Sequence, residues 1–387
     1  MNHSLVLIPR DPVIARDGRP FGDAGLTRQH TLPWPLPSTI VGSIRTLLGY
    51  QTGQRFDGAF IDRLKSLSIQ GPFPVSGDSL FLPAPCDALQ TKDGRCVRLE
   101  PMAFHGHSGT DLPAGLSPVV PPAAASLQKF SPPPAWWSVN KIKQWLLANP
   151  DPDFFTATSE FRQSAAVDER THVKIEPKTF AAEKHKLFST QGLVLDRLRE
   201  SGSSSHESQL ACTVTLDDSE LNACLSNLHT LQPVGGERRV AEFQINANRS
   251  TSHFDCPAEI ATRLNQIKEG DGLRMVLATP ALFSEGWRPG WLNEDNGRTG
   301  NLPLPSGGQL RLRLTAVCNQ RWDALSGWSY EFRGPKEARR MVPAGGVYFF
   351  EVLESSSVNW SSLWLQSVSD DRQDRRDGFG LAILGPG

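Results

Sequence analysis

The sequence lacks the features that identify several large classes of protein. Its 387 residues contain no run near the roughly 20 apolar residues that a membrane-spanning helix needs. The N-terminal stretch MNHSLVLIPRDP has too short an apolar run, and the wrong flanks, for a secretory signal peptide. The cysteines form no CxxC pair, which argues against a zinc ribbon or a disulfide framework. We therefore expect a cytoplasmic protein with reduced cysteines at Cys86, Cys96, Cys212, Cys224, Cys256 and Cys318.

Common catalytic motifs are also absent. There is no Walker loop, no HExxH and no GxSxG. His105, His107 and Asp111 are residues of the ligand type, but they lie in a loop rich in proline and alanine with no second cluster, so we predict no metal and no cofactor. His30, just before the first expected helix, is the remaining candidate for a general acid or base.

Net charge is nearly absent as well. The formal charge is -1, and the isoelectric point is about 6.8. A protein that holds nucleic acid through bulk positive charge has a different composition, so any polyanion site must be a local patch on a neutral body. The length is sufficient for two domains with their own cores, and 30 prolines and 33 glycines indicate many turns.

The stretch PLPSTIVGSIRTLLGY, residues 35–50, predicts a helix with two unlike faces. Ser38 is placed to cap its start and Gly49 to end it, which gives a helix over residues 38–48. One face of this helix carries an apolar stripe, and the opposite face carries small residues and a single arginine. Because a glycine inside a helix costs about 1 kcal/mol relative to alanine, Gly42, Ser43 and Arg45 predict that another group approaches this face closely.

Short strands and amphipathic helices are mixed along the chain. Strands are expected near the N-terminus, around a turn at residues 76–78, and repeatedly after residue 270; helices are expected in WWSVNKIKQWLLAN and PAEIATRLNQIKEG. Residues 105–135 predict an irregular excursion, and a basic hairpin is expected over about 170–195. This pattern is typical of an α+β fold with antiparallel sheets packed against helices.

Cations gather in four clusters, each beside a turn or a pair of glycines. One lies in the hairpin, and the others are GGERR, FRGPKEARR and RQDRRDGFG. Each cluster alone also fits a solvated charged face. Arginine and lysine beside exposed main-chain amides suit a phosphodiester backbone, and a cationic hairpin suits single-stranded RNA. Most of the ten tryptophans are expected in cores or a protein interface, whereas Phe188 at the hairpin is a candidate for base stacking.

Six stretches in order along residues 9–387 carry a family resemblance. They are PRDPVIARDGRPF, PLPSTIVGSIRTLLG, VGGERR, TPALFSEGWRPGW, KEARRMVPAGGVYFFE and GFGLAILGPG, with the weakest coverage over residues 86–165. Together they resemble the RAMP superfamily of CRISPR proteins and, within it, the third subunit of the type III-B (Cmr) effector complex.

The resemblance implies two ferredoxin-like (RRM-type) domains. Residues 1–240 would form the first, with insertions at about 86–165 and the basic hairpin, and residues 241–387 the second, ending in a glycine-rich loop. It also implies a non-catalytic subunit for antiviral defence that binds the 5′ region of the crRNA and joins the large polymerase-like subunit to the backbone RAMP subunit.

The same resemblance gives roles to individual residues. Arg45 would pair with a phosphate, and the hairpin would displace or kink the guide near its 5′ tag. The interior of the terminal loop, LAIL, lacks a basic residue, so Arg375 and Arg376 would substitute for it. The residues expected to contact RNA are Arg19, Gly42, Ser43, Arg45, Arg170, Lys174, Lys178, Lys184, Lys186, Gly235, Gly236, Arg238, Arg239, Arg333, Lys336, Arg339, Arg340, Arg375, Arg376, Gly378 and Gly380.

Two alternatives stay open. The first is a metal-independent RAMP endoribonuclease that matures crRNA with His30 as acid or base, although Tyr50, Tyr330 and Tyr348 offer no obvious partner for it. The second is a scaffold that contacts only protein through its proline-rich and tryptophan-rich surfaces.

Overall fold

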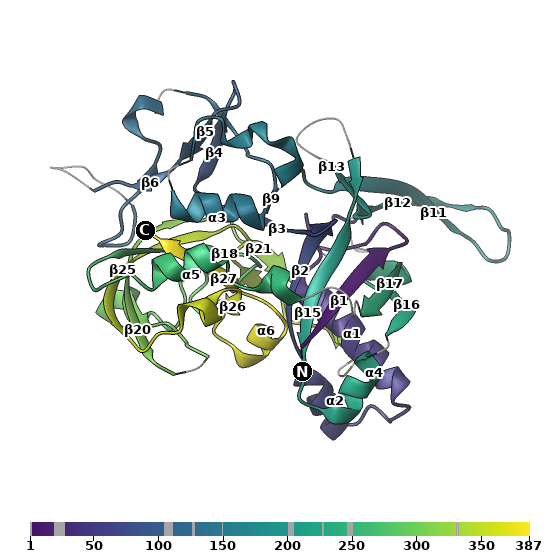
Figure 1. Cartoon of the computed structure of the whole chain (residues 1–387). Helices are drawn as coiled ribbons and strands as arrows, with labels where there is room; N and C mark the ends of the chain where they lie inside the picture. The colour runs from purple at the N-terminus through teal and green to yellow at the C-terminus, as the bar shows by residue number, and fades with distance from the viewer. Residues whose placement is uncertain are drawn as a thin grey trace.

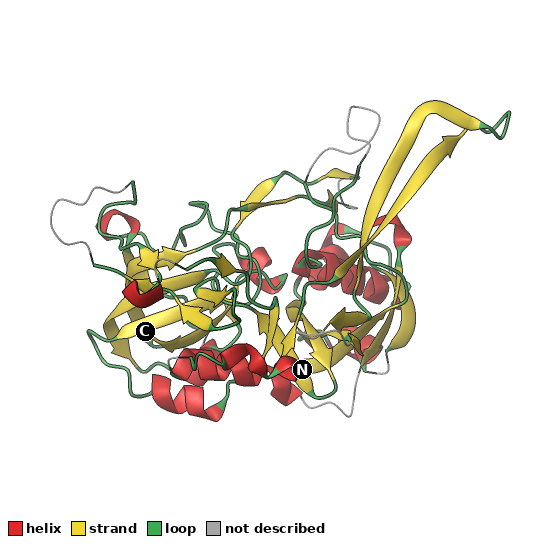
Figure 2. Cartoon of the chain, turned by 90° about the horizontal axis from the view of Figure 1, so that it is seen from above, coloured by secondary structure: helices red, strands yellow, loops and turns green. Residues whose placement is uncertain are grey.

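The computed structural model describes residues 2–18, 28–103, 111–125, 128–148, 150–199, 205–226, 228–245, 251–305, 307–329, 331 and 333–387. Within these ranges the chain is mixed α and β, with two large antiparallel sheets side by side (Figure 1). A long two-stranded hairpin projects from the body (Figures 1 and 2). The expected mixture of helices with antiparallel sheets is confirmed.

The first sheet is built mainly from the N-terminal half of the chain. Its strands lie in the order β10 (Phe161–Arg162), β9 (Trp136–Ser138), β3 (Ser79–Pro83), β2 (Ser68–Ser76), β15 (Gln209–Thr215), β1 (Asn2–Pro9), β17 (Val240–Ile245) and β16 (His229–Pro233). The turn expected at residues 76–78 joins β2 to β3. Strand β17 pairs with β1 and so belongs to this sheet, although it begins at Val240 and continues past the predicted division; that division, at residues 240 and 241, stays a prediction.

The second sheet uses residues from 272 onward. Its strands lie in the order β19 (Thr299–Asn301), β20 (Gln309–Cys318), β25 (Val347–Ser356), β18 (Gly272–Leu277), β27 (Leu381–Pro386) and β26 (Gln366–Ser367). Strand β20 alternates buried leucines with arginines, because one face packs on the core and the other is solvated.

The two sheets share a strand order. In the first, the central strands are β2, β15, β1 and β17; in the second, they are β20, β25, β18 and β27. When the four strands of each group are numbered by their position in the sequence, their order across the sheet is second, third, first, fourth in both groups. In both sheets the first strand therefore lies between the third and the fourth.

Helices cover the sheets. Helix α1 (Pro37–Gln51) packs with α2 (Gly58–Lys65) and α4 (Ser219–Leu225) against the first sheet. Helix α3 (Val139–Leu147) and α5 (Ala258–Leu264) lie together against β27, whereas α6 (Arg372–Arg376) contacts β2 (Figure 1).

The ends predicted for the first helix are wrong. Pro37 occupies the first helical position, where its fixed φ is suitable, and the Ser38 side chain makes no cap. The helix continues through Gly49 to Gln51. A Cβ atom at Gly49 would collide with the ring of Phe56, so close packing within the chain explains this glycine. A Cβ atom at Gly42, in contrast, would meet no described atom within 4 Å.

Residues 86–165 connect the two sheets. They add β9 and β10 to the first sheet, form the small sheet of β4 (Ala88–Thr91), β5 (Cys96–Arg98) and β8 (Phe130–Ser131), and place α3 on the second sheet. The part of the expected 105–135 excursion that the structure describes contains β7 (Val119–Val120), one short 3-10 turn and β8; β7 pairs with β6 (Glu100–Pro101). Trp137 and Trp145 are buried here, as expected for core tryptophans.

A buried ionic cluster holds this connection together. Asp87 is 0% exposed; its carboxylate accepts a hydrogen bond from Trp145 Nε1 at 3.1 Å and lies 3.6 Å from Arg274 Nε. The guanidinium of Arg98 lies over the Trp145 ring and donates to Ala148 O. Burial, with Arg274 nearby, lowers the pKa of Arg98 to about 10, and burial raises the pKa of Asp87 against the pull of both arginines.

Candidate nucleic-acid interface

The basic hairpin consists of β11 (Ala166–Ile175) and β12 (Ala182–Val194), so this prediction is confirmed. Since side chains alternate across a strand, Arg170, His172 and Lys174 share one face with Lys186 and Phe188 of the opposite strand. The rings of His172 and Phe188 stack with centroids 5.0 Å apart. The hairpin therefore has one face that combines cations with an aromatic stack.

The cations of the hairpin differ in how they are neutralised. Arg170 pairs with Asp168 at 2.7 Å and Lys174 with Glu183 at 3.0 Å, both on the exposed surface. Lys178 at the turn and Lys184 on β12 are exposed and have no ion pair with any described residue. Phe180, at the tip, is 83% exposed. The outer end of the hairpin thus offers both uncompensated charge and an unburied aromatic ring.

The base of the hairpin is fixed to the body. The backbone of Val13 exchanges hydrogen bonds with Leu193, and Gln29 N donates to Ser189 O at 2.8 Å. Arg28 pairs with Glu169 at 2.5 Å. These contacts hold the base firmly, whereas the outer half extends away from the body (Figure 2).

One segment, residues 10–18, connects three of the four basic clusters. Its Val13 pairs with the hairpin, and its Ile14 O accepts a hydrogen bond from Gly236 N at 2.9 Å. Its Gly18 lies against Ala324, which pairs with Arg340 of the FRGPKEARR cluster. A Cβ atom added to Gly18 would lie 3.0 Å from Ala324 Cβ. The tertiary structure therefore gathers clusters that are far apart in the sequence around one strand-like segment.

In the GGERR turn, the polar groups are partly used within the chain. The amide of Gly236 donates to Ile14 O, so it is not available to bind an anion, contrary to the expectation from the sequence. Gly235 packs against the same carbonyl. Arg239 is mostly buried and donates to Glu237 at 3.1 Å. Arg238 is exposed and has no partner among the described residues, so it is the member of this turn best placed to meet a ligand.

The FRGPKEARR cluster lies on an antiparallel ribbon that we call the 322–341 ribbon; residues 330 and 332 are outside its described part. Strands β21 (Asp323–Leu325) and β24 (Arg339–Met341) pair near its base, and β22 (Trp328–Ser329) and β23 (Gly334–Pro335) pair farther out. Arg339 forms a bidentate pair with Asp374, which raises the pKa of Arg339. Arg333, Lys336 and Arg340 are exposed.

The fourth cluster forms part of the seam between the sheets rather than a free basic face. Gly378 has φ +88°, and a Cβ atom there would lie 2.9 Å from Ile69 Cγ1 of β2. The amide of Gly380 donates to Pro280 O at 2.7 Å. Gly378 thus permits close packing of the two halves, whereas Gly380 packs against Ser369 within the second half. The amide of Gly378 donates to Arg375 O at 3.2 Å, so both amides are already hydrogen-bonded within the chain. Arg375 and Arg376 are half-buried, and Arg375 lines a 280 Å³ pocket that also contains the carboxylate of Asp370.

The polar face of α1 is also packed inside the chain. Ser43 Oγ donates to Pro233 O at 2.6 Å. Arg45 donates to the carbonyls of Leu64 and Leu67 at 3.0 Å each and pairs with Asp377 at 2.8 Å. The phosphate role expected for Arg45 is therefore replaced by a structural one, in which its guanidinium joins α1 to the end of α2 and to α6.

We predict that Arg45→Ala destabilises the protein by about 1–3 kcal/mol, because it leaves several carbonyls and the Asp377 carboxylate without their charged donor. Affinity for single-stranded RNA should stay unchanged. Urea unfolding and an RNA titration of the folded variant measure the two effects. A tenfold loss of RNA affinity with unchanged stability would contradict the structural role and indicate that Arg45 contacts RNA.

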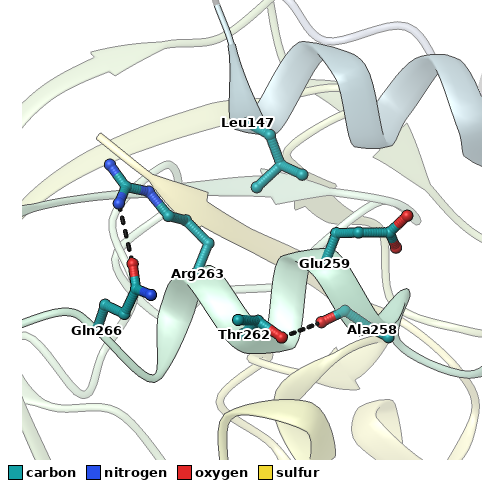
Figure 3. Close-up of a pocket in the computed structure, with 6 residues that line it drawn as sticks. All are labelled: Leu147, Ala258, Glu259, Thr262, Arg263 and Gln266. Atoms are coloured by element: carbon teal, nitrogen blue, oxygen red, sulfur yellow. Dashed lines mark hydrogen bonds between the residues drawn. The ribbon is translucent and has the colours of Figure 1, made fainter.

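A separate pocket of 390 Å³ lies between the end of α3 and α5, lined by Leu147, Ala258, Glu259, Thr262, Arg263 and Gln266 (Figure 3). Thr262 Oγ1 donates to Ala258 O, and Arg263 donates to Gln266 Oε1 at 3.0 Å. Glu259 accepts a hydrogen bond from Lys143 of α3 at 2.8 Å, so Glu259, Thr262 and Arg263 all form hydrogen bonds within the chain. The pocket contains none of the residues predicted to contact RNA.

Some predicted residues lie outside the description. Arg19, His105 and His107 fall in ranges that the structure does not describe. Among the residues that it does describe, no group of histidine, cysteine and carboxylate side chains has the arrangement of a metal site. No helix in the same ranges is long and apolar enough to cross a membrane.

Sequence reasoning missed the two tryptophans of the 322–341 ribbon. Trp322 and Trp328 belong to the tryptophans expected in cores or a protein interface; they are 45% and 58% exposed, so they lie outside the cores. The signal was present in NQRWDALSGWSYEFRGPKEARR, where both tryptophans lie within a few residues of arginine or lysine. Only the pairing of the strands shows that these aromatic and cationic residues belong to one ribbon, and that Arg340 lies against the Trp322 ring.

Comparison with known proteins gave one family match over nearly the whole chain. A family model described as CRISPR-associated protein (Cas_Cmr3) matches residues 5–386. No curated protein gave a match.

Solved structures gave more distant matches. One is a chain in a cryo-EM structure of the type III-B Cmr-beta complex bound to cognate target RNA and AMPPnP, with 13% identity, 89% of this chain and 86% of that chain covered, and a TM-score of 0.48. A chain in the same complex bound to cognate target RNA has 14% identity, the same coverage and a TM-score of 0.48. A chain of the Csm3-Csm4 subcomplex of the type III-A interference complex has 11% identity, coverage of 100% and 99%, and a TM-score of 0.37.

Proposed function

Because this chain belongs to the Cas_Cmr3 family of CRISPR-associated proteins, we propose that it is the crRNA-binding subunit of a type III-B RNA-guided effector complex. The observation that carries the proposal is the family match over residues 5–386, which includes every basic cluster described above. The bound segment is the 5′ region of the crRNA, and the role is binding and assembly in antiviral defence.

The convergence of basic clusters around the 10–18 segment supports RNA as the ligand. A neutral chain needs a local patch to attract a polyanion, and Lys178, Lys184 and Arg238 are exposed cations without an ion-pair partner in the described part of the chain. In this proposal the hairpin displaces or kinks the guide near its 5′ tag, with the His172–Phe188 stack on the face that meets the bases.

The repeated strand order supports two ferredoxin-like domains as the scaffold. Order second, third, first, fourth in antiparallel strands is the order of a βαββαβ unit. The first sheet has a helix after its first and third strands, α1 and α4, as such a unit requires. The second sheet has α6 before its fourth strand. In the described residues, its first connection contains a short 3-10 turn and strand β19 in place of an α-helix.

The remaining parts of the proposal concern partners and chemistry. The subunit joins the large polymerase-like subunit to the backbone RAMP subunit, it acts in the cytoplasm, and it contributes no catalytic group. The near-neutral charge favours a subunit whose RNA grip is completed by neighbours.

The test is to purify a tagged copy from its native host and to sequence the RNA that is recovered with it. Discrete small RNAs that share one 5′ tag are expected. Protein partners without RNA would favour the scaffold alternative. Cleavage of repeat RNA by the purified chain would favour the endoribonuclease if His30→Ala abolishes it. The control is His229→Ala, which changes an exposed histidine and should leave that cleavage intact.

A further inference from the structure

The 322–341 ribbon has an inner face that fixes it to the body. Leu325 and Met341 are buried in the hydrophobic core of the first sheet. Leu325 pairs with Arg339 across the ribbon, and the bidentate Arg339–Asp374 contact ties the same face to α6. These contacts account for the position of the ribbon without any help from its outer side chains.

The outer face carries aromatic rings beside cations. Arg340 is on the opposite face from Arg339, and its guanidinium lies 4.8 Å from the centroid of the Trp322 ring. Trp322 is 45% exposed, so the cation covers only part of the indole. A planar group could therefore stack on the open part of this ring while the guanidinium meets a negative charge.

A second ring follows farther along the ribbon. Trp328 is 58% exposed and lies directly opposite Pro335. Lys336 N donates to Gly327 O at 2.7 Å, and the Lys336 stem passes 3.9 Å from the position of a Cβ atom on Gly327. The exposed Lys336 therefore follows directly after the residue that faces Trp328, so a second cation accompanies the second indole along the ribbon.

The charge of this surface favours a nucleic acid over a protein. Arg321, Arg333, Lys336 and Arg340 have no ion pair with any described residue. The acidic residues of the ribbon are Asp323, Glu337 and Glu331, and Glu331 is neutralised by Lys65 of α2 at 2.8 Å. Protein interfaces favour tryptophan and arginine but are depleted of lysine at their centres. Exposed aromatic rings interleaved with cations are typical of surfaces that bind single-stranded nucleic acid.

We propose that Trp322 and Trp328 form a stacking platform for unpaired bases of RNA, with Arg340 and Lys336 as partners for the adjacent phosphates. The inference rests on the proposed RNA-binding function and adds the chemistry of recognition: bases stacked on indoles, read without a preference for sequence. Its link to the hairpin is the 10–18 segment, which contacts both elements.

The experiment is a titration of the full chain, at low salt, with fluorescent single-stranded oligouridine of about ten nucleotides. Trp322→Ala and Trp328→Ala should each weaken binding about 5- to 100-fold and leave the salt dependence unchanged, because they remove a stacked base rather than a phosphate contact. Trp328→Phe should retain most of the affinity. Arg340→Ala should instead reduce the slope of log affinity against log salt by about 0.7, the value for one phosphate contact on a single strand.

Two controls separate stacking from other effects. Trp287 is 38% exposed but lies outside the ribbon, so Trp287→Ala should bind RNA as the parent does. An oligonucleotide with abasic sites loses the stack on both rings, so it should bind the parent more weakly than the normal probe binds Trp328→Ala. It should bind the parent and Trp328→Ala alike.

The possible failures are distinct. If the parent chain does not bind the RNA, the proposed function fails and this inference fails with it. If the parent binds and the tryptophan variants bind equally well, the stacking platform alone is wrong. Release of a partner subunit from the purified complex by Trp328→Ala, with RNA affinity unchanged, would also overturn the platform and assign the ribbon to a protein interface.

Discussion

Replacing Asp87 by alanine is expected to destabilise the folded chain by about 3–5 kcal/mol, the typical cost of removing one member of a buried ion pair. The carboxylate is fully buried between Arg98 and Arg274 and accepts the indole N–H of Trp145. Without it, two guanidinium groups remain in a low dielectric with no counter-charge. Urea unfolding followed by circular dichroism measures the change.

The location of the cluster explains why the effect is large. Arg98 comes from β5, Trp145 from α3 and Arg274 from β18, so Asp87 joins residues 86–165 to the second sheet. Loss of the carboxylate weakens this connection as well as the pair itself. We expect reduced cooperativity of unfolding, because the 86–165 region would separate from the second sheet before the remaining core unfolds.

Two variants make this prediction specific. Asp93→Ala removes an aspartate from an exposed pair with Arg95 and should change stability little, since water screens that interaction. The double variant Asp87→Leu with Arg274→Met removes both charges and should recover part of the lost stability. A loss within about 1 kcal/mol for Asp87→Ala would contradict the role given to the cluster.

Reversing two charges on the hairpin should weaken RNA binding strongly. Lys178 and Lys184 are exposed and unpaired among the described residues, so Lys178→Glu with Lys184→Glu replaces two attractions by two repulsions without breaking an internal contact. Affinity for single-stranded RNA is expected to fall about 10- to 100-fold at low salt, and the salt slope by about 1.4, or 0.7 for each lost phosphate contact. Fluorescence anisotropy over a series of salt concentrations measures both quantities.

The matched control is a double variant with the same change of net charge at two lysines outside the hairpin. Lys92, in the turn between β4 and β5, and Lys268, after α5, are exposed. Strands β4 and β5 and helix α5 lie away from the hairpin of β11 and β12 (Figure 1). Reversing both should leave the affinity near that of the parent, apart from a small long-range effect that salt removes. Equal losses in the two double variants would mean that RNA responds to net charge and not to the hairpin.

Local patterns determined much of the fold. The alternation in β20, the apolar stripe of α1 and the Asp218 cap of α4 are effects of neighbouring residues, and the expected elements are present. The strands of the hairpin could be predicted for the same reason. The ends of α1 could not, because Gly49 lies within the helix and its neighbour Phe56 is set by packing rather than by helix-end chemistry.

The residues of the candidate site could be predicted from the sequence far less well than the helices and strands could, because they depend on tertiary contacts. The sequence by itself determined the family resemblance, the absence of bulk charge and the presence of four basic clusters. It could not tell a free cation from a paired one: Arg45 and Arg339 are bound to Asp377 and Asp374, residues more than 30 positions away, whereas Lys178 and Arg238 are not paired within the described chain. Ion pairing, burial and shared faces depend on which distant segments meet. For that physical reason only the folded chain could separate the arginines that hold it together from the cations and tryptophans left for a ligand.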